Sequence, residues 1–265
     1  MICDRIFLQK MDNVYIIPIG SGSIGNCFYV EIGNYKFLID MGIGYNRCKA
    51  ALNKHECRIE DLDAVFVTHG HHDHVKAAPA ICNHIPCKVY TNKSVLYSLH
   101  NAKAEKIVLE RDETAELFDD FKVRMFSLPH DFAYTCGFTF ESADTRVSYV
   151  TDCGKMSKRI FNEIKDSAVI IIETNHDIQM LKNGPYPLQL QKRILSAHGH
   201  LSNDDCAIAV SKLKEAGCSN FLLAHISRHN NTPEMALHTV RSLLNDDTIY
   251  LYACPEAGDD LLHFQ

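Results

Sequence analysis

The sequence predicts a layered α/β fold, and three observations support that prediction. Short runs rich in valine, isoleucine, phenylalanine and tyrosine recur along the chain and are typical of strands. Stretches with helical amphipathic spacing lie between them. No internal repeat, low-complexity tract or linker interrupts the pattern, so we expect one domain over residues 1–265. Strands and helices interleaved in this way fit a sandwich of sheets covered by helices.

The expected elements follow one another from residue 14 onward. The expected strands cover residues 14–19, 27–32, 36–40, 64–69, 88–91, 106–109, 121–128, 137–142, 146–152, 168–174, 220–225 and 248–253. The expected helices cover roughly residues 45–54, 74–84, 93–101, 155–165, 203–216 and 233–244. The helix at 203 has Ser202 or Asn203 as its cap and Gly217 at its end. The helix at 233 has Thr232 as its cap and Pro233 in its first position. The most loop-like interior segment is 183–189.

Composition limits the classes of protein that fit. The net charge of −6 gives no general attraction for nucleic acid. The 11 cysteines are scattered, which favours reduced thiols in a cytoplasmic protein over a disulfide framework. The N-terminus is typical of neither a signal peptide nor a membrane span, and residues 1–10 are expected to form a loose extension. No membrane association and no obligate protein partner are therefore predicted.

Several strands end in a residue that can bind metal. His69, His130, Asp152 and His225 each follow an apolar run. Polar residues at strand tips are often placed in loops that build a site along one shared edge. We therefore expect these four side chains to belong to one site.

The densest group is THGHHDHV, which begins at Thr68. His69, His71, Asp73 and His74 supply imidazoles and a carboxylate within six residues, and these donors suit zinc and similar divalent ions. His72 is expected to point away. A polar loop with chance histidines is the alternative, and the tight spacing argues against it.

This group resembles the H-x-H-x-D-H motif of the metallo-β-lactamase superfamily, and His130, Asp152 and His225 follow in that family's order. The resemblance implies a four-layer αββα sandwich and a hydrolase with two divalent ions per chain. Zinc fits the ligands best, with manganese or iron as alternatives. One ion is implied to take His69, His71 and His130, and the other Asp73, His74 and His225, with Asp152 bridging them. Asp73 is accordingly expected to be essential for catalysis.

The chemistry of that ligand set is consistent with hydrolysis. Two ions that share a hydroxide produce a nucleophile near neutral pH. Two dications less two aspartates and one hydroxide leave a charge of +1, which attracts an anionic substrate. Oxidoreductase members of the superfamily have an acid where this chain has His71, so the resemblance implies hydrolysis. Cys153, the neighbour of Asp152, is expected to have a packing role.

The segment GSGSIGN, from Gly20 to Asn26, contains three further candidates. Its backbone N–H groups can face an anion, with Ser21, Ser23 and Asn26 as candidate substrate-binding residues. A β-turn without a ligand is the alternative. The segment resembles the opening of the YycJ/WalJ-like exonuclease group of the superfamily.

The stretch SAHGHLSNDD points to a proton donor. It resembles the G-H-S-T and G-H-A-S segments of RNA-cleaving relatives, in which the histidine after the glycine acts on the phosphate. The resemblance assigns that role to His200, with Glu173 at the end of an apolar strand as the acid that orients it. His198 is expected to be a hydrogen-bonding or capping neighbour at the site rather than a metal ligand.

Two more candidates lie near the proposed edge. His176 belongs to an N-H-D segment that the YycJ/WalJ-like group also shows, and Arg228 follows His225. Basic residues cluster nearby, although an ordinary solvated surface is an alternative explanation. The cluster comprises Lys155, Lys158, Arg159, Lys182, Lys192, Arg193 and Arg228.

The sequence thus predicts a two-metal phosphodiesterase, and by resemblance an exonuclease that degrades DNA from 5′ to 3′. We find neither a β-CASP insertion nor a long exosite arm in the sequence, which argues against large structured RNA substrates and favours a compact phosphodiesterase. A hydrolase of small phosphodiesters or other anionic esters is one alternative. A metal-binding regulatory protein without catalysis is the other, and the candidate proton donor argues against it.

Overall fold

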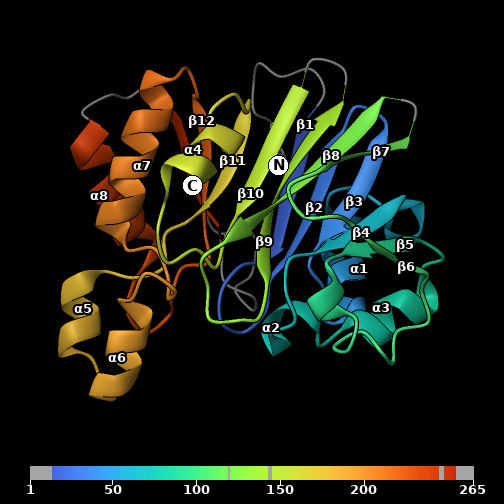
Figure 1. The fold of residues 1–265 in the computed structure, drawn as a ribbon, viewed down its shortest axis with the longest axis horizontal. Helices are drawn as coiled ribbons and strands as arrows, with labels where there is room; N and C mark the ends of the chain where they lie inside the picture. The colour runs from blue at the N-terminus through green and yellow to red at the C-terminus, as the bar shows by residue number, and fades with distance from the viewer. Residues whose placement is uncertain (1–13, 119, 143–144, 245–247, 255–265) are drawn as a thin grey trace. The chain divides into compact units, whose positions relative to one another are not determined.

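The computed structural model describes residues 14–118, 120–142, 145–244 and 248–254 (Figure 1). The predicted loose extension at residues 1–10 lies outside these ranges. The described chain divides into two compact units, and the boundary falls between Glu110 and Arg111. We call them the N-terminal unit and the C-terminal unit and describe each by itself.

The N-terminal unit is built on a six-stranded sheet with the order β1-β2-β3-β4-β5-β6. Its strands are β1 (Val14–Gly20), β2 (Cys27–Ile32), β3 (Tyr35–Ile39), β4 (Ala64–Val67), β5 (Lys88–Thr91) and β6 (Lys106–Val108). Its helices are α1 (Tyr45–Lys54), α2 (His72–Val75) and α3 (Ala78–His84), with 3₁₀ turns η1 (Ile59–Asp61) and η2 (Lys93–Val95). Strands β1 to β3 are antiparallel and β3 to β6 are parallel. Leu52 of α1 and Ile81 of α3 are buried in one core with Leu38 and Val65 of the sheet.

The C-terminal unit is built on a seven-stranded sheet with the order β13-β12-β11-β10-β9-β8-β7. Its strands are β7 (Thr114–Phe118), β8 (Phe121–Leu128), β9 (Thr135–Ser142), β10 (Thr145–Val150), β11 (Val169–Glu173), β12 (Asn220–Ala224) and β13 (Tyr250–Ala253). Its helices are α4 (Lys158–Ile164), α5 (Ile178–Asn183), α6 (Leu188–Ile194), α7 (Asn203–Glu215) and α8 (Pro233–Leu244). Strands β10 to β13 are parallel. Ile160 of α4, Leu213 of α7 and Val240 of α8 belong to one core with the sheet.

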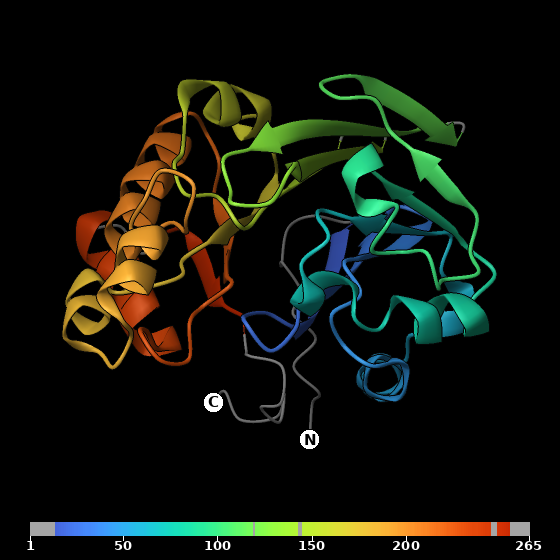
Figure 2. The same ribbon diagram turned by 60° about the horizontal axis from the view of Figure 1, so that its bottom comes forward.

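The structure departs from the expected elements in a few places. The expected helix over 74–84 is two helices, because α2 ends at Val75 and α3 has Pro79 in its first turn. A continuous helix would place the proline ring against the carbonyl of Val75 and lose a hydrogen bond. The expected helix over 93–101 contains only the turn η2. Strand β7 and helices α5 and α6 were not expected, and the loop-like segment shortens to residues 184–187 between α5 and α6. Figures 1 and 2 both show these two helices side by side.

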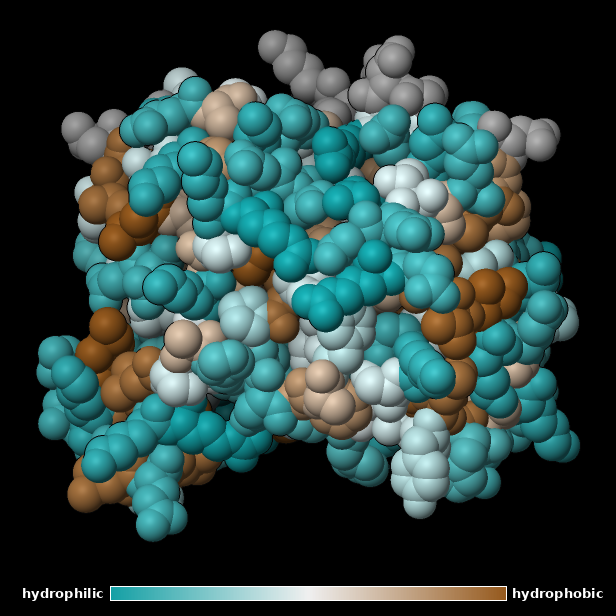
Figure 3. All heavy atoms as spheres, in the orientation of Figure 1, coloured by the Kyte–Doolittle hydropathy of each residue, from teal (hydrophilic) through white to brown (hydrophobic). Residues whose placement is uncertain are grey.

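One face of the molecule is mainly polar. The face drawn in Figure 3 is largely hydrophilic, with apolar residues in small patches. The large hydrophobic residues that are exposed are Tyr97, Val108, Leu188, Leu195, Ile208 and Leu243. Within the described ranges, every helix is too short or too polar to cross a membrane.

Candidate metal centre and acid site

The N-terminal unit brings the four donors of the HGHHDH segment together. We call His69, His71, Asp73 and His74 the N-terminal cluster. Buried strand β4 leads directly into His69, whose Nε2 lies 3.0 Å from Nδ1 of His71. Two nitrogens bound to one tetrahedral zinc ion lie about 3.3 Å apart, given zinc–nitrogen distances near 2 Å. Nε2 of His74 lies 3.6 Å from Oδ2 of Asp73. These donor types and separations fit a divalent ion, whereas His72 is exposed, as expected.

Asp40 supports this cluster, and the sequence analysis did not identify it. Its Oδ2 accepts a hydrogen bond of 2.7 Å from Nδ1 of His74, and its Oδ1 accepts one of 2.9 Å from the backbone N–H of Thr68. A proton held on Nδ1 leaves the Nε2 lone pair of His74 for a metal. Burial raises the pKa of Asp40, although His74 and Thr68 oppose that shift. The sequence contains one indication of this role, because Asp40 is an acidic residue at the end of the apolar strand FLID.

Asn26 also contacts the N-terminal cluster. Its Oδ1 accepts a hydrogen bond of 2.8 Å from the N–H of Gly22, which fixes the orientation of the amide. Its Nδ2 lies 3.0 Å from Nε2 of His74 and donates to Oδ2 of Asp73 at 3.3 Å. The backbone N–H of Asn26 donates to the carbonyl of Asp73 as well. The residue therefore braces the segment that supplies the ligands.

The rest of the GSGSIGN loop has a structural role in this unit. A Cβ at Gly42 would lie 1.7 Å from the Asp73 carbonyl oxygen, so the loop, Gly42 and Asp73 are closely packed. The N–H of Gly25 donates to the carbonyl of Gly22, which leaves it no hydrogen for an anion. Ser21 is buried and Ser23 is exposed. Of the three candidates in this loop, Ser23 is the most accessible to a substrate.

The C-terminal unit gathers the remaining donors around Asp152. We call His130, Asp152, Glu173, His200 and His225 the C-terminal cluster. Oδ1 of Asp152 lies 3.4 Å from Nε2 of His130 and 3.7 Å from Nε2 of His225. Nδ1 of His130 donates to the carbonyl of Gly199 at 3.0 Å, which directs its Nε2 toward Asp152. A carboxylate oxygen between two imidazoles has the position that a bridging ligand needs.

Glu173 is completely buried at the end of β11 and accepts four hydrogen bonds. Its Oε1 accepts from Nδ1 of His200 and from Nδ1 of His225, each at 2.8 Å. Its Oε2 accepts from the N–H groups of Cys153, at 2.8 Å, and Leu201, at 3.1 Å. A buried carboxylate is costly unless it is paired in this way. Glu173 therefore orients both histidines at once.

The same contacts set the ionisation of Glu173. Burial would raise its pKa, but the charge of His200 and the hydrogen bonds from His200 and His225 outweigh burial and hold the pKa at about 2. The carboxylate thus remains ionised across the neutral range.

His200 lies where the sequence analysis expected it, in contact with Glu173. Because Nδ1 of His200 bonds to Glu173, its Nε2 is directed away from that carboxylate. The side chain is 21% exposed, which leaves it accessible. The contact between His225 and Glu173 was not foreseen. One donor atom from each of Asp152, Glu173, His200 and His225 lies within 4.8 Å of the others.

Two residues of the C-terminal cluster and Asp40, which supports the N-terminal cluster, share an unusual backbone conformation. Asp40, Asp152 and His225 have φ angles of 63°, 56° and 57°. Each lies just beyond the end of a strand, where the left-handed conformation turns the chain sharply. That conformation costs a non-glycine residue about 1–2 kcal/mol, and such outliers are often found at functional sites.

The other candidates of the C-terminal unit have mixed outcomes. His198 and Arg228 are exposed, and the α7 cap is Ser202, whose hydroxyl accepts the N–H of Asp205; a capping role for His198 was therefore wrong. His176 is buried, and neither ring nitrogen has a hydrogen-bond partner among the described residues. Burial lowers its pKa to about 4. Cys153 packs in the core, as expected, and its thiol contacts the carbonyl of Lys155.

Comparison with known proteins places this geometry in context. A family model described as the beta-lactamase superfamily domain matches residues 35–226. The exodeoxyribonuclease YycJ of Bacillus anthracis is 30% identical over 232 residues, which cover 86% of this chain and 88% of that protein. The exodeoxyribonuclease WalJ of Streptococcus pneumoniae serotype 2 is 31% identical over 229 residues, which cover 84% and 85% of the two chains.

The solved structures agree in fold. The metallo-beta-lactamase fold protein YhfI from Bacillus subtilis superimposes with a TM-score of 0.69 at 16% identity, over 94% of this chain and 99% of that one. The predicted fold class, a mixed α/β fold of the metallo-β-lactamase type, is confirmed.

Proposed function

This chain belongs to the beta-lactamase superfamily, within its YycJ/WalJ-like group, and on that premise we propose that this metal-dependent hydrolase is a DNA exonuclease. The observation that carries the proposal is the pair of hydrogen bonds from His200 and His225 to the Glu173 carboxylate. That arrangement places a histidine suited to proton donation in the same cluster as candidate metal ligands. Hydrolysis of a phosphodiester needs both, because the leaving oxygen has to be protonated.

We propose that the two clusters supply the ligands of two divalent ions. The donor types favour zinc, and manganese or iron are alternatives. When bound, such ions supply a hydroxide nucleophile near neutral pH. The proposed ligands are His69, His71 and His130 for one ion, Asp73, His74 and His225 for the other, and Asp152 as the bridge.

In this proposal, side chains of the protein supply the proton that the leaving oxygen receives. Glu173 holds the Nδ1–H of His200, so the proton that is transferred is the one on Nε2. His200 donates it to the oxygen that leaves the phosphorus, and Glu173 stabilises the imidazolium before the transfer. Asp40 has a different task, because its bond to Nδ1 of His74 fixes the tautomer that binds metal.

The substrate class follows from the relatives. Both curated relatives are named exodeoxyribonucleases, and this chain covers 88% and 85% of their lengths. We therefore propose DNA rather than RNA. The resemblance to the YycJ/WalJ-like group is the ground on which we propose cleavage from a 5′ end. A hydrolase of small phosphodiesters or other anionic esters is the second candidate, because the same clusters serve that chemistry.

One assay tests the proposal. The zinc- or manganese-loaded protein is incubated with DNA and RNA oligonucleotides labelled at the 5′ or the 3′ end, and in parallel with bis-p-nitrophenyl phosphate and a β-lactam. We expect stepwise release of nucleotides from DNA at a rate well above that for RNA, with no β-lactam hydrolysis. Turnover of bis-p-nitrophenyl phosphate without any cleavage of DNA would instead support the second candidate.

A further inference from the structure

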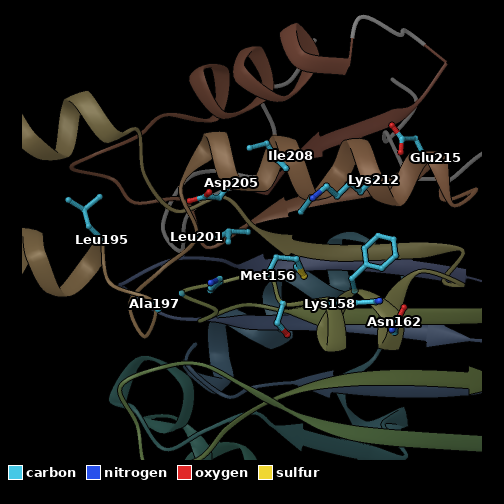
Figure 4. Close-up of a pocket in the computed structure, with 15 residues that line it drawn as sticks. Met156, Lys158, Asn162, Leu195, Ala197, Leu201, Asp205, Ile208, Lys212 and Glu215 are labelled. Carbon is cyan, nitrogen blue, oxygen red and sulfur yellow. The ribbon is translucent and has the colours of Figure 1, made fainter.

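The C-terminal unit has a cleft of about 860 Å³ between α4 and α7 (Figure 4). Met156 and Phe161 lie on the α4 side, and Ile208 lies on the α7 side. Leu201 also lines the cleft, and Ile208 is among the few large hydrophobic residues that are exposed. The walls therefore present apolar surface that the described fold does not cover.

The backbone segments that line one end of this cleft also carry residues of the C-terminal cluster. Gly154 and Ala197 line it, and a Cβ on Gly154 would lie 2.6 Å from the carbonyl oxygen of Ala197, so the two segments are in close contact. Leu201 also lines the cleft, and its N–H donates to Glu173. A ligand in the cleft would thus lie along the segments that carry Asp152 and His200.

The cleft is also lined by lysines. The side chains of Lys155, Lys158 and Lys212 form no ion pair with any residue in the described ranges, whereas Lys49 and Lys122 elsewhere pair with glutamates. The three lysines of the cleft offer positive charge to a phosphate backbone.

Two acidic residues also line the cleft, but neither blocks this use. The carboxylate of Asp205 accepts the hydroxyl proton of Ser202 at 2.7 Å and is held at the start of α7. Figure 4 shows Glu215 at the end of the cleft away from Ala197. Figure 4 also shows Asp205 beside Leu201, with Lys158 and Lys212 farther along the cleft from Ala197.

We propose that this cleft binds the DNA strand beside the scissile phosphate, with a base against Phe161 and Met156 and phosphates against Lys158 and Lys212. The inference deepens the proposed function and rests on it. Stacking of a base on an aromatic ring tolerates any sequence, as an exonuclease requires. A purely apolar groove would suit many partners, but the lysines and the shared backbone with His200 favour the substrate strand.

The test uses the full-length, metal-loaded chain and two variants. These are Phe161→Ala and the double variant Lys158→Ala/Lys212→Ala. Steady-state kinetics are measured on a single-stranded DNA oligonucleotide and on bis-p-nitrophenyl phosphate, which is too small to reach along the cleft. The ratio of kcat/KM for DNA to that for the small ester should fall about 5-fold or more in each variant, mainly through KM.

Matched controls separate the cleft from general effects. Lys214→Ala removes the same charge from α7 but lies outside the cleft lining, so the ratio should stay at the wild-type value. Phe161→Tyr should restore the ratio lost in Phe161→Ala, because it keeps the ring. Each lysine removed should reduce the slope of log affinity against log salt concentration by about 0.7.

Equilibrium binding tests whether the cleft binds DNA independently of whether the protein cleaves it. Fluorescence anisotropy measures the affinity of a labelled oligonucleotide for the wild type and the variants. Weaker binding in the variants supports the cleft even if no DNA is cleaved, in which case only the proposed function fails. Unchanged affinity and an unchanged kinetic ratio would overturn the inference and leave the cleft to a partner of another class.

Discussion

At the scale of single residues, the carboxylate of Glu173 connects two histidines to two backbone amides. Glu173→Gln removes an acceptor, because the glutamine NH₂ would face either the histidine N–H groups or those of Cys153 and Leu201. We expect a loss of about 1–3 kcal/mol in the free energy of unfolding, measured by urea titration. Glu163→Gln is the control, because Glu163 pairs with Arg124 at a partly exposed position. Equal stability of Glu173→Gln and the wild type would contradict the role of this carboxylate.

The depressed pKa of Glu173 also predicts how stability depends on pH. The folded pKa of about 2 lies below the ordinary value of 4.5, so the folded state favours the ionised form. The contribution of Glu173 is complete above about pH 4.5 and is lost as the pH falls toward 2. The difference in unfolding free energy between the wild type and Glu173→Gln should therefore shrink from pH 6 to pH 3. A difference that is constant over this range would count against the assignment.

Removal of His200 separates proton donation from metal binding. We expect His200→Ala to slow phosphodiester cleavage by about 10²–10⁴-fold, the range typical of acid–base groups. The metal content, measured by mass spectrometry of the purified protein, should match that of the wild type. If the variant loses metal, His200 is a ligand and the assignment is wrong.

Asp40 gives a prediction about metal affinity. Asp40→Asn weakens the hydrogen bond that fixes the His74 tautomer, and loss of such a partner typically costs 10–100-fold in metal affinity. Competition with a chromophoric zinc chelator measures the change. Asp63→Asn is a matched control, because Asp63 also accepts a backbone N–H but lies outside the cluster. Equal metal affinities for the two variants would contradict a role for Asp40 in metal binding.

At this scale the sequence allowed the pairing of Glu173 with His200 to be predicted, because a strand-end acid and a G-H segment form a recognisable pattern. Asp40 was missed, because a lone acid after a strand resembles many turns. The bond between Glu173 and His225 was missed for another reason. It depends on the register of β11 and β12, which sets Glu173 opposite Ala224. No local pattern encodes that register.

At the scale of elements, Ser202 connects a helix to the acid site. Ser202→Ala removes the cap of α7 and is expected to cost about 1 kcal/mol, measured by urea unfolding. It should also lower turnover, because Ser202 lies two residues after His200. Thr232→Ala removes a similar hydrogen bond at the start of α8 and should cost similar stability with little effect on turnover. Equal turnover in the two variants would show that the cap of α7 does not affect hydrolysis.

The elements that were predicted are the buried ones. Strands such as β4 and β11 are buried at every position, and their continuous apolar runs are distinctive. Strand β7 and helices α5 and α6 were missed because they are short and half-exposed, so they need little apolar patterning. The break between α2 and α3 can be predicted from the sequence, because Pro79 disfavours a continuous helix.

At the scale of the whole molecule, bound metal should stabilise the folded chain. An ion that binds only the folded state adds about 2.7 kcal/mol at a free concentration 100 times its Kd. We expect EDTA to lower the midpoint of thermal unfolding and abolish hydrolysis, and added zinc to restore both. Scanning fluorimetry with parallel assays checks this. If EDTA changed neither the midpoint of thermal unfolding nor the turnover rate, metal dependence would be contradicted.

Net charge is a whole-molecule property that does not by itself indicate the substrate class. A value of −6 argued mildly against a polyanionic substrate. The structure shows why the sum is uninformative: acids such as Glu163 and Asp112 are paired with arginines, while the lysines of the α4–α7 cleft are not. Which charges remain available depends on folding, so composition alone did not reveal it.

The left-handed residues Asp40, Asp152 and His225 have a consequence for evolution and engineering. Glycine adopts this conformation without the penalty that other residues incur, so the backbone energy alone would favour glycine at all three positions. Selection for turnover would keep two acids and a histidine there. A consensus or stability-guided redesign of this chain should therefore exclude these positions, since glycine there would remove side chains of the proposed metal and acid sites.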